Sequence, residues 1–148
     1  MNNRKKALFN SRFEMAVRIL LLLDIANEHL SADKILSLDF IICYSNDYGF
    51  ETPNLHGINM YKLSEMANRR KLVYNSIRSL VTKGMIQATV DKGYTFCITA
   101  SGIKFVDSLT SEYSKEYREI GMSIIEKYGG ESEENLLKLL HSREASEE

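Results

Sequence analysis

The spacing of apolar residues predicts that most of the chain is helical. Ser11 and Glu14 match a capping box, in which a serine hydroxyl and a glutamate carboxylate each accept a hydrogen bond from a free backbone N–H at a helix start. A helix is therefore expected over residues 11–28. Ser31 stands where it can cap a second helix, which should extend over residues 33–44 before a cluster of turn-forming residues ends it.

The first of these helices carries apolar side chains on nearly every face. One stripe contains Phe13, Val17, Leu20 and Leu21, and the other faces contain Met15, Ala16, Ile19, Leu22 and Leu23. A helix that is apolar all round must be covered on more than one side. In so small a domain, another chain is one expected source of that cover.

The middle of the chain predicts an ordered loop followed by two short helices. The loop extends to Gly57 and contains the single proline, Pro53. Helices are expected over residues 61–69 and 72–83, and the second has an apolar stripe at helical spacing, formed by Val73, Ile77, Leu80 and Val81. Gly84 follows, where a helix C-cap requires a left-handed residue.

The apolar period then changes from helical to alternating over residues 85–99. This change predicts a hairpin with one apolar face and a turn at residues 91–93. After Thr99 or Ser101, a single helix of about six turns is expected to continue to Gly129, because apolar residues recur at steps of three and four: Ile103, Val106, Leu109, Tyr113, Tyr117, Ile120 and Ile124. One more short helix and a charged tail follow.

This order of elements indicates a mainly α fold with a small β-hairpin (α+β). A hairpin directly after an Arg/Lys-bearing amphipathic helix is typical of a winged helix-turn-helix core, here with extra N- and C-terminal helices. We expect a flexible N-terminus over residues 1–10, a winged-helix domain with a long C-terminal helix over 11–128, and a short helix with an acidic tail over 129–148. The 148 residues and the apolar fraction of 44% suit one core.

The charges are balanced in total but unevenly distributed. The chain contains 19 Lys and Arg against 20 Asp and Glu, which argues against a protein that coats nucleic acid by bulk attraction. Residues 1–104, however, contain 14 basic and 9 acidic side chains, whereas residues 105–148 contain 5 and 11. Within residues 61–84 there are six basic side chains and one acidic side chain.

No catalytic constellation is recognisable in the sequence. His29, His56 and His141 fall in three different elements, and none has metal-ligand spacing to another His or to a Cys. There is no nucleophile-elbow serine and no glycine-rich phosphate loop. We therefore expect a protein that is not an enzyme and that needs no cofactor or metal.

The cysteines and the hydropathy favour a cytoplasmic protein. Cys43 and Cys97 are flanked by apolar or aromatic residues, which indicates buried reduced thiols. No signal peptide is recognisable, and the longest apolar run, residues 19–23, is far shorter than the ~20 residues that span a bilayer.

The basic segment has two interpretations. In a helix-turn-helix, its second helix would enter the major groove and present polar side chains to bases and phosphates. The candidate DNA-binding residues are then Arg69, Arg70, Lys71, Tyr74, Asn75, Arg78 and Thr82, with Lys92 at the hairpin tip. Alternatively, the helix has an ordinary solvated face in a domain that binds protein, and Tyr74 covers the edge of the core. The residues alone do not decide between the two.

Several short segments share their order and spacing with a known family. They are FNSRFEMAVRIL from Phe9, LDFIICYSNDYG from Leu38, NLHG from Asn54, the Arg69-Arg70 pair with the helix ending at Gly84, and GYTFCIT from Gly93. In these segments the chain resembles, from about residue 9 to 120, the middle component of ABC-three-component systems of the Lamassu type. The family usually has Leu-His-Pro where this chain has Leu-His-Gly.

The resemblance implies a non-enzymatic adaptor with a winged-helix core. Its partners would be an SMC-like ABC ATPase and an effector, often a nuclease, in bacterial defence against phage or plasmids. The positions that match the family pattern are Phe9, Asn10, Ser11, Glu14, Arg18, Asp39, Tyr44, Asp47, His56, Arg69 and Arg70. The candidate partner-interface residues are Phe13, Val17, Leu20, Leu21, Asp39, Tyr44, His56, Tyr113 and Tyr117.

Two functional hypotheses result. The first is an assembly subunit that binds an ATPase and either itself or an effector, and the apolar first helix together with the over-long C-terminal helix supports it. The alternative is a dimeric winged-helix transcription regulator that reads a palindromic operator, which the basic segment supports.

Overall fold

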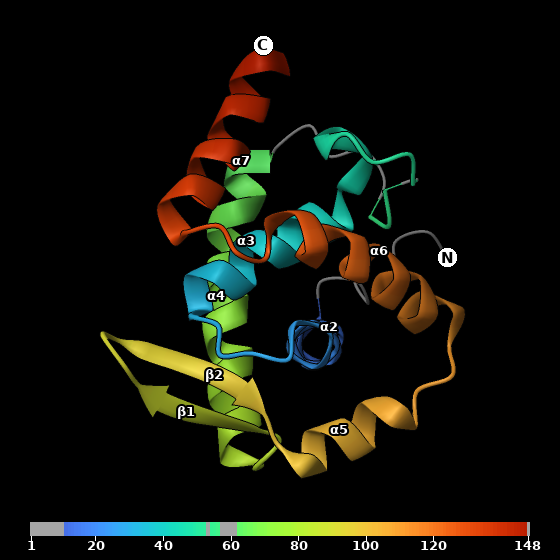
Figure 1. The fold of residues 1–148 in the computed structure, drawn as a ribbon, viewed down its shortest axis with the longest axis vertical. Helices are drawn as coiled ribbons and strands as arrows, with labels where there is room; N and C mark the ends of the chain where they lie inside the picture. The colour runs from blue at the N-terminus through green and yellow to red at the C-terminus, as the bar shows by residue number, and fades with distance from the viewer. Residues whose placement is uncertain (1–10, 53, 57–61, 148) are drawn as a thin grey trace.

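The computed structural model describes residues 11–52, 54–56 and 62–147. The expectations for residues 1–10, Pro53, Gly57 and Tyr61 lie outside these ranges. The described elements are α2 (Arg12–Ala26), α3 (Ala32–Cys43), the 3₁₀ helix η1 (Ser45–Tyr48), α4 (Lys62–Thr82), β1 (Ile86–Val90), β2 (Tyr94–Ile98), α5 (Ala100–Asp107), α6 (Glu112–Tyr128) and α7 (Glu133–Glu147) (Figure 1). The mainly helical fold with a small antiparallel hairpin confirms the predicted class.

Helix α2 lies at the centre of the molecule. Figure 1 looks along its axis, and α4, α6, α5, α3 and β2 all pack against it. Its residues Val17, Leu20 and Leu21 are consequently buried within this chain, which itself supplies the cover for which another chain was one expected source. Phe13 is the exception among the candidate interface residues of α2, because 66% of its surface is exposed.

The chain covers α2 by itself because the predicted long C-terminal helix is two helices. Helix α5 ends at Asp107 and α6 begins at Glu112, so the expected continuous helix is wrong. The Ser111 hydroxyl accepts a hydrogen bond from the backbone N–H of Ser114 and caps the start of α6. The break lets α6 fold back against α2 and α3, which removes the argument that an over-long helix must contact a partner.

The two short helices expected over 61–69 and 72–83 form the single helix α4. Arg70 and Lys71 are good helix formers, and no glycine or proline separates the two predicted segments. A helix-turn-helix within this region is therefore wrong. Gly84 has a φ of 73° and occupies the left-handed position that was predicted after the helix.

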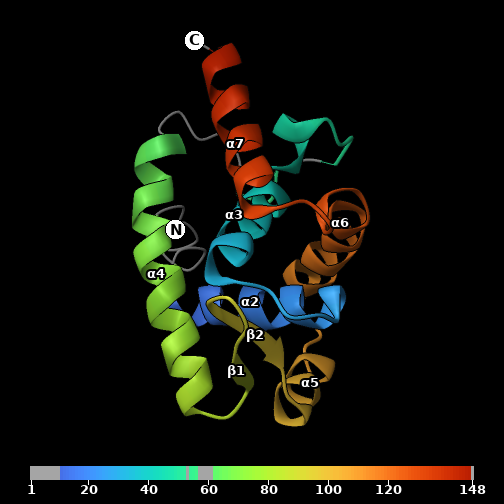
Figure 2. The same ribbon diagram turned by 60° about the vertical axis from the view of Figure 1, so that its left-hand side comes forward.

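The hairpin has the predicted strands, and it gains a further partner. Ile86 pairs with Ile98, and Val90 pairs with Tyr94 at the far end (Figure 2). Leu30, between α2 and α3, forms an antiparallel bridge to Phe96, with its N–H and C=O bonded to the same residue at 3.0 and 2.8 Å. The hairpin is therefore held to the connection between the first two described helices.

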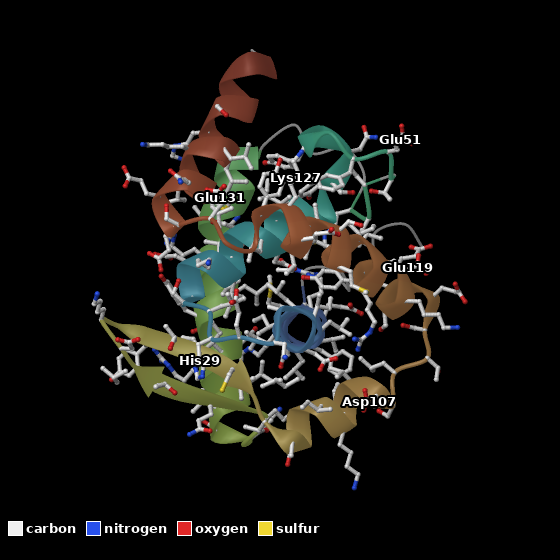
Figure 3. All side chains as sticks on the ribbon, viewed as in Figure 1. His29, Glu51, Asp107, Glu119, Lys127 and Glu131 are labelled. Carbon is white, nitrogen blue, oxygen red and sulfur yellow. The ribbon has the colours of Figure 1, made fainter. Side chains whose placement is uncertain are left out.

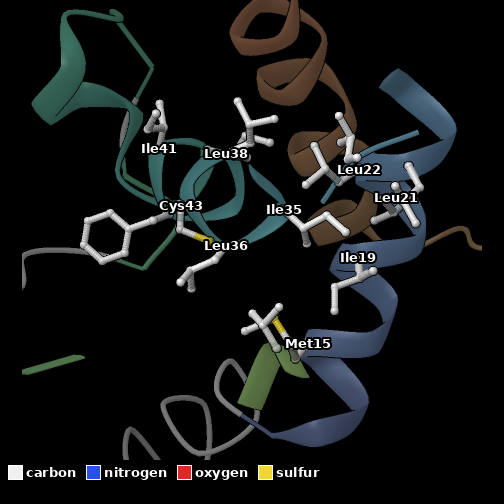
Figure 4. Packing of buried hydrophobic residues seen from close by; sticks show 14 of the residues in the cluster. Met15, Ile19, Leu21, Leu22, Ile35, Leu36, Leu38, Ile41 and Cys43 are labelled. Atoms are coloured by element: carbon white, nitrogen blue, oxygen red, sulfur yellow. The ribbon is translucent and has the colours of Figure 1, made fainter. Parts of the chain in front are cut away.

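Helices α2 and α3 supply the largest share of the buried apolar side chains, which pack against each other and against the surrounding helices. Figure 4 shows some of these side chains, among them Met15, Ile19 and Ile35, all of which are buried. Ser11 and Ser31 cap the two helices as predicted, accepting hydrogen bonds from Glu14 N–H and Lys34 N–H.

Helix α7 packs against α3 with Leu136 and Leu140, and it extends to Glu147 over most of the expected tail. Both cysteines are free; Cys43 is buried, but Cys97 is only partly buried, contrary to expectation. Among the described helices, none combines the length and the apolar character needed to cross a bilayer.

Candidate functional site

A cluster of polar side chains lies in the interior where four helices meet. Its members, named here the Asp39 cluster, are Arg18 from α2, Asp39 from α3, Arg69 from α4, Tyr113 and Tyr117 from α6, and His56 from the segment between η1 and α4. Asp39 and Arg18 have no exposed side-chain surface. Buried charges of this kind require partners, and the cluster supplies them.

The Asp39 carboxylate is the centre of the cluster. Arg18 binds it with two nitrogens, Nε to Oδ1 at 2.9 Å and Nη2 to Oδ2 at 3.3 Å. Arg69 Nη1 donates to Oδ2 at 2.8 Å, and the Tyr117 hydroxyl donates to Oδ1 at 2.7 Å. One carboxylate therefore joins three other helices through charge-assisted hydrogen bonds.

His56 connects the cluster to the start of α6. Its Nδ1 lies 2.9 Å from Arg69 Nη2, and its Nε2 lies 2.8 Å from the Tyr113 hydroxyl. Because a guanidinium can only donate, Nδ1 must accept and the ring proton belongs on Nε2. His56 is thus held as the neutral Nε2–H tautomer.

The surroundings of the cluster are aromatic. The Arg69 guanidinium carbon lies 5.4 Å from the centre of the Phe40 ring and 5.5 Å from that of Tyr44. Cation–π contact with these rings supports a cation that is removed from water. Tyr44, a candidate interface residue, is therefore a buried neighbour of Arg69.

The cluster shifts the ionisation of its central members. Burial alone would raise the pKa of Asp39, but the charges of Arg18 and Arg69 and the hydrogen bonds from Arg18 and Tyr117 lower that pKa to about 2. Burial, together with repulsion from the same two arginines, lowers the pKa of His56 to about 2. Asp39 is consequently ionised and His56 neutral at physiological pH.

The nearby weak acids move in the opposite direction. Burial, reinforced by the Asp39 charge, raises the pKa of Cys43 to about 11. Burial also raises the pKa of Tyr113 and of Tyr117 well above the usual tyrosine range. None of the three is disposed to exchange a proton near neutral pH, and the cluster joins the helices as an ionic crosslink.

This arrangement changes the meaning of several candidate interface residues. Asp39 and Tyr117 are fully buried, and His56 and Tyr113 are hydrogen-bonded to each other. In this structure they contact other parts of the same chain, so their observed role is to hold the helices together. The sequence does carry a signal for them, because Arg18 and Asp39 each interrupt a run of apolar residues in a buried helix.

The candidate DNA-binding residues of α4 divide into two groups. Arg69 points inward to Asp39, and its side chain is almost entirely buried, so it is not available to a nucleic acid here. Arg70 pairs with Asp33 at 2.7 Å, and the Tyr74 hydroxyl donates to the same carboxylate at 2.9 Å. Tyr74 thus covers the edge of α3 while it remains partly exposed.

The remaining candidates lie on the outer face of α4. Lys71 and Arg78 are exposed and Asn75 is half-buried, on a side of the helix that faces solvent. A surface groove of about 360 Å³ runs between this face and the start of α2. We call it the Arg78 groove; its lining residues are Arg12, Asn75, Arg78, Ser79, Thr82 and Lys83. Of these, the candidate DNA-binding set of the sequence analysis did not include Arg12, which belongs to a different helix, nor Ser79 and Lys83.

Two other hollows lie elsewhere on the surface. Lys92, at the hairpin tip with a φ of 54°, lines a groove of about 460 Å³ with Tyr74, Tyr94 and the start of α3. A pocket of about 420 Å³ between α6 and the segment after η1 has an apolar floor that includes Phe50 and Ile120. Glu51 and Glu119 of this pocket project outward on the same side of the molecule (Figure 3).

In the described parts of the chain, no group of three or more His, Cys, Asp or Glu side chains is arranged to hold a metal ion. His29 and His141 are exposed, and His56 belongs to the Asp39 cluster.

Comparison with known proteins gives one result that covers almost the whole chain. Residues 8–147 match the family model described as ABC-three component (ABC-3C) system Middle Component 2. No curated protein and no solved structure matches. The match begins just before α2 and ends with α7, so it includes both the Asp39 cluster and the Arg78 groove. The chain therefore belongs to the Middle Component 2 family of ABC-three component systems.

Proposed function

We propose that this protein is a non-enzymatic adaptor subunit of a bacterial defence complex of the Lamassu type. Membership of the family makes it a component of a multi-subunit system and is consistent with a non-catalytic subunit. In the proposed role it links an SMC-like ABC ATPase to an effector of the nuclease type, in defence against phage or plasmids. The observation that carries the proposal is the family match over residues 8–147.

Exposed apolar side chains provide candidate contact surfaces for the proposed partners. Val90 and Tyr94 face each other at the end of the hairpin and are 71% and 67% exposed. They continue the apolar face that Ile86 and Phe96 bury nearer the core. Large exposed apolar side chains at an extremity are typical of protein-binding surfaces.

The adaptor role predicts a complex that depends on this chain. The protein and the two other components encoded with it would be co-expressed, with an affinity tag on the ATPase, and purified with and without the middle component. We expect the effector to co-purify with the ATPase only when the middle component is present. Effector recovery in its absence, or a middle component that binds neither partner, contradicts the proposal.

A pair of variants locates the surface. Val90→Ser combined with Tyr94→Ser should reduce recovery of one partner at least tenfold, about 1.4 kcal/mol of binding free energy. Met122→Ser is the matched control, since Met122 is similarly exposed but lies on α6. Equal recovery with both variants would remove the hairpin end from the interface.

A winged-helix core is part of the proposal. The order α2, α3, α4 and hairpin supports it, and so does the bridge between Leu30 and Phe96, which adds a short third strand to the hairpin. The departure is that the end of α3 at Cys43 and the start of α4 at Lys62 are much further apart in sequence than the short turn of a helix-turn-helix allows.

The second candidate function is a dimeric winged-helix transcription regulator. One observation favours it, namely that Lys71, Asn75 and Arg78 lie on the outer face of α4, the helix directly before the hairpin with Lys92. It predicts that one operator sequence binds at least about 10³-fold more tightly than unrelated DNA. Selection from a random duplex library tests this, and an unenriched library argues against a regulator.

A further inference from the structure

The Arg78 groove combines three cationic side chains from two helices. Arg12 comes from the first turn of α2, Arg78 comes from the second half of α4, and Lys83 is the residue directly after α4. All three are exposed, and the groove has no acidic side chain among its lining residues. A concave surface with cations alone along its walls concentrates positive potential and suits an anionic ligand.

These cations differ from the other arginines of α4. Arg69 is neutralised by Asp39 and Arg70 by Asp33, whereas Arg12, Arg78 and Lys83 take part in no ion pair within the described residues. Their charge is therefore available to a ligand.

The groove also has neutral hydrogen-bond donors. Asn75 and Ser79 line it between the cations, and amide and hydroxyl groups of this kind commonly bind phosphate oxygens. Lys71 lies one turn before Asn75 on the same exposed side of α4, so the basic surface continues from Lys71 along the helix to Lys83 just beyond its end. The helical part of this stretch, residues 71–82, corresponds to roughly 17 Å, enough for several phosphates of one strand.

The shape and composition of the groove identify the class of ligand. No aromatic side chain lines it, whereas surfaces that bind single strands stack bases on aromatic rings. For the groove to read a base sequence, base edges would have to enter between α2 and α4. Phosphates, by contrast, project from the outside of a duplex and can reach the groove directly. We propose that the Arg78 groove binds the phosphate backbone of double-stranded DNA without reading its sequence.

This inference goes beyond the adaptor role and does not depend on it. The adaptor role is tested by co-purification with the other two components, and the groove by DNA binding of the chain alone. A protein that binds DNA but no partner, or partners but no DNA, separates the two proposals.

The experiment measures binding to a fluorescent duplex of about 20 base pairs and random sequence, by anisotropy, from about 50 to 200 mM KCl. Three phosphate contacts predict a slope of log K against log salt of about −2.7, or a loss of affinity of roughly 40-fold over this range. Arg12→Ala, Arg78→Ala and Lys83→Ala together should weaken binding at least tenfold at the lowest salt and flatten the slope toward zero.

A control variant with the same change in net charge tests whether the groove or the total charge is responsible. Lys104→Ala, Lys115→Ala and Lys138→Ala remove three exposed lysines from α5, α6 and α7. We expect the control to retain binding within about twofold. Circular dichroism and the melting temperature of both triple variants establish that each is folded, and the single variant Arg78→Ala, with an expected slope change of about 0.9, provides a milder test.

Four results would overturn the inference. The first is no measurable binding by the natural chain, and the second is an equal loss of affinity in the two triple variants. The third is tighter binding to a single strand or to duplex RNA of the same sequence. The fourth is a preference for one duplex sequence that is large enough to indicate base reading. The last result would instead favour the regulator.

Discussion

At the scale of single residues, the molecule depends most on the Asp39 carboxylate. It is fully buried and accepts hydrogen bonds from Arg18, Arg69 and Tyr117. Formation of a buried ion pair gives little net stability, because desolvation of the charges offsets their attraction. Removal of one partner is costly, however, because it leaves the other charges buried without compensation.

Asp39→Asn should therefore destabilise the protein by about 3–5 kcal/mol, since two buried guanidinium groups lose their counter-charge while the side-chain volume is kept. Urea unfolding followed by circular dichroism measures the change. The matched control is Asp33→Asn on the same helix, which removes a partly exposed pair with Arg70 and should cost about 1 kcal/mol or less. Similar losses in the two variants would show that the buried cluster is not critical for stability.

His56 predicts a specific dependence of stability on pH. Its folded-state pKa is lowered to about 2, so below the ordinary value of 6.5 the unfolded chain takes up a proton that the folded chain does not. The free energy of unfolding should fall by about 1.4 kcal/mol per pH unit between about pH 6 and pH 4. Asp39, with its lowered pKa, adds its own loss only below about pH 4.

The control for this prediction is His56→Gln, which can keep a donor and an acceptor but cannot be protonated. Urea unfolding at a series of pH values should give a shallower slope for the variant, by about 1.4 kcal/mol per pH unit. Parallel slopes for the two proteins would contradict the buried, neutral state of His56.

At the scale of elements, local signals were predictable and long-range ones were not. The caps at Ser11, Ser31 and Thr99 were identified because each bonds to a backbone N–H only three residues away. The break between α5 and α6 was missed because Leu109 and Tyr113 keep a helical spacing of four residues across it.

The Asp39 cluster could not be predicted from local patterns, because its members are far apart in the sequence. Asp39 meets Arg18 across 21 positions and Tyr117 across 78, so no window of sequence contains the group. The resemblance to the family did single out Arg18, Asp39, His56 and Arg69, but it gave no indication that they are in contact. The basic face of α4 was predicted in part, and the structure reassigned Arg69 from the surface to the interior.

The junction between the hairpin and α5 predicts a sharp difference between two glycines. A Cβ on Gly102 would lie 2.3 Å from the Met85 backbone oxygen and 2.6 Å from Ile98 Cγ1, whereas a Cβ on Gly130 would meet no atom within 4 Å. Gly102→Ala should therefore destabilise the protein by about 1–3 kcal/mol through overpacking, and Gly130→Ala by less than about 0.5 kcal/mol. Thermal unfolding of the two variants measures this, and equal melting temperatures would contradict the close packing of α5 on the hairpin.

At the scale of the whole molecule, the uneven charge found in the sequence acquires a spatial meaning. Arg78 of α4 and Lys83 directly after it line the Arg78 groove with Arg12 at the start of α2, whereas the acidic side chains of Glu51 and Glu119 project outward on the side of the molecule where α6 lies (Figure 3). The nearly neutral net charge therefore conceals two surfaces of opposite character. The two surfaces should therefore attract ligands of opposite charge.

The Asp39 cluster also restricts how the helices can move relative to one another. Helices α2, α3, α4 and α6 all meet at one carboxylate. Sliding α2 or α4 past α3 would separate charges inside an apolar core, and sliding α6 would break the hydrogen bond from Tyr117. That separation costs several kcal/mol, more than a typical allosteric coupling energy of about 1–3 kcal/mol. The four helices should therefore move together as one rigid body.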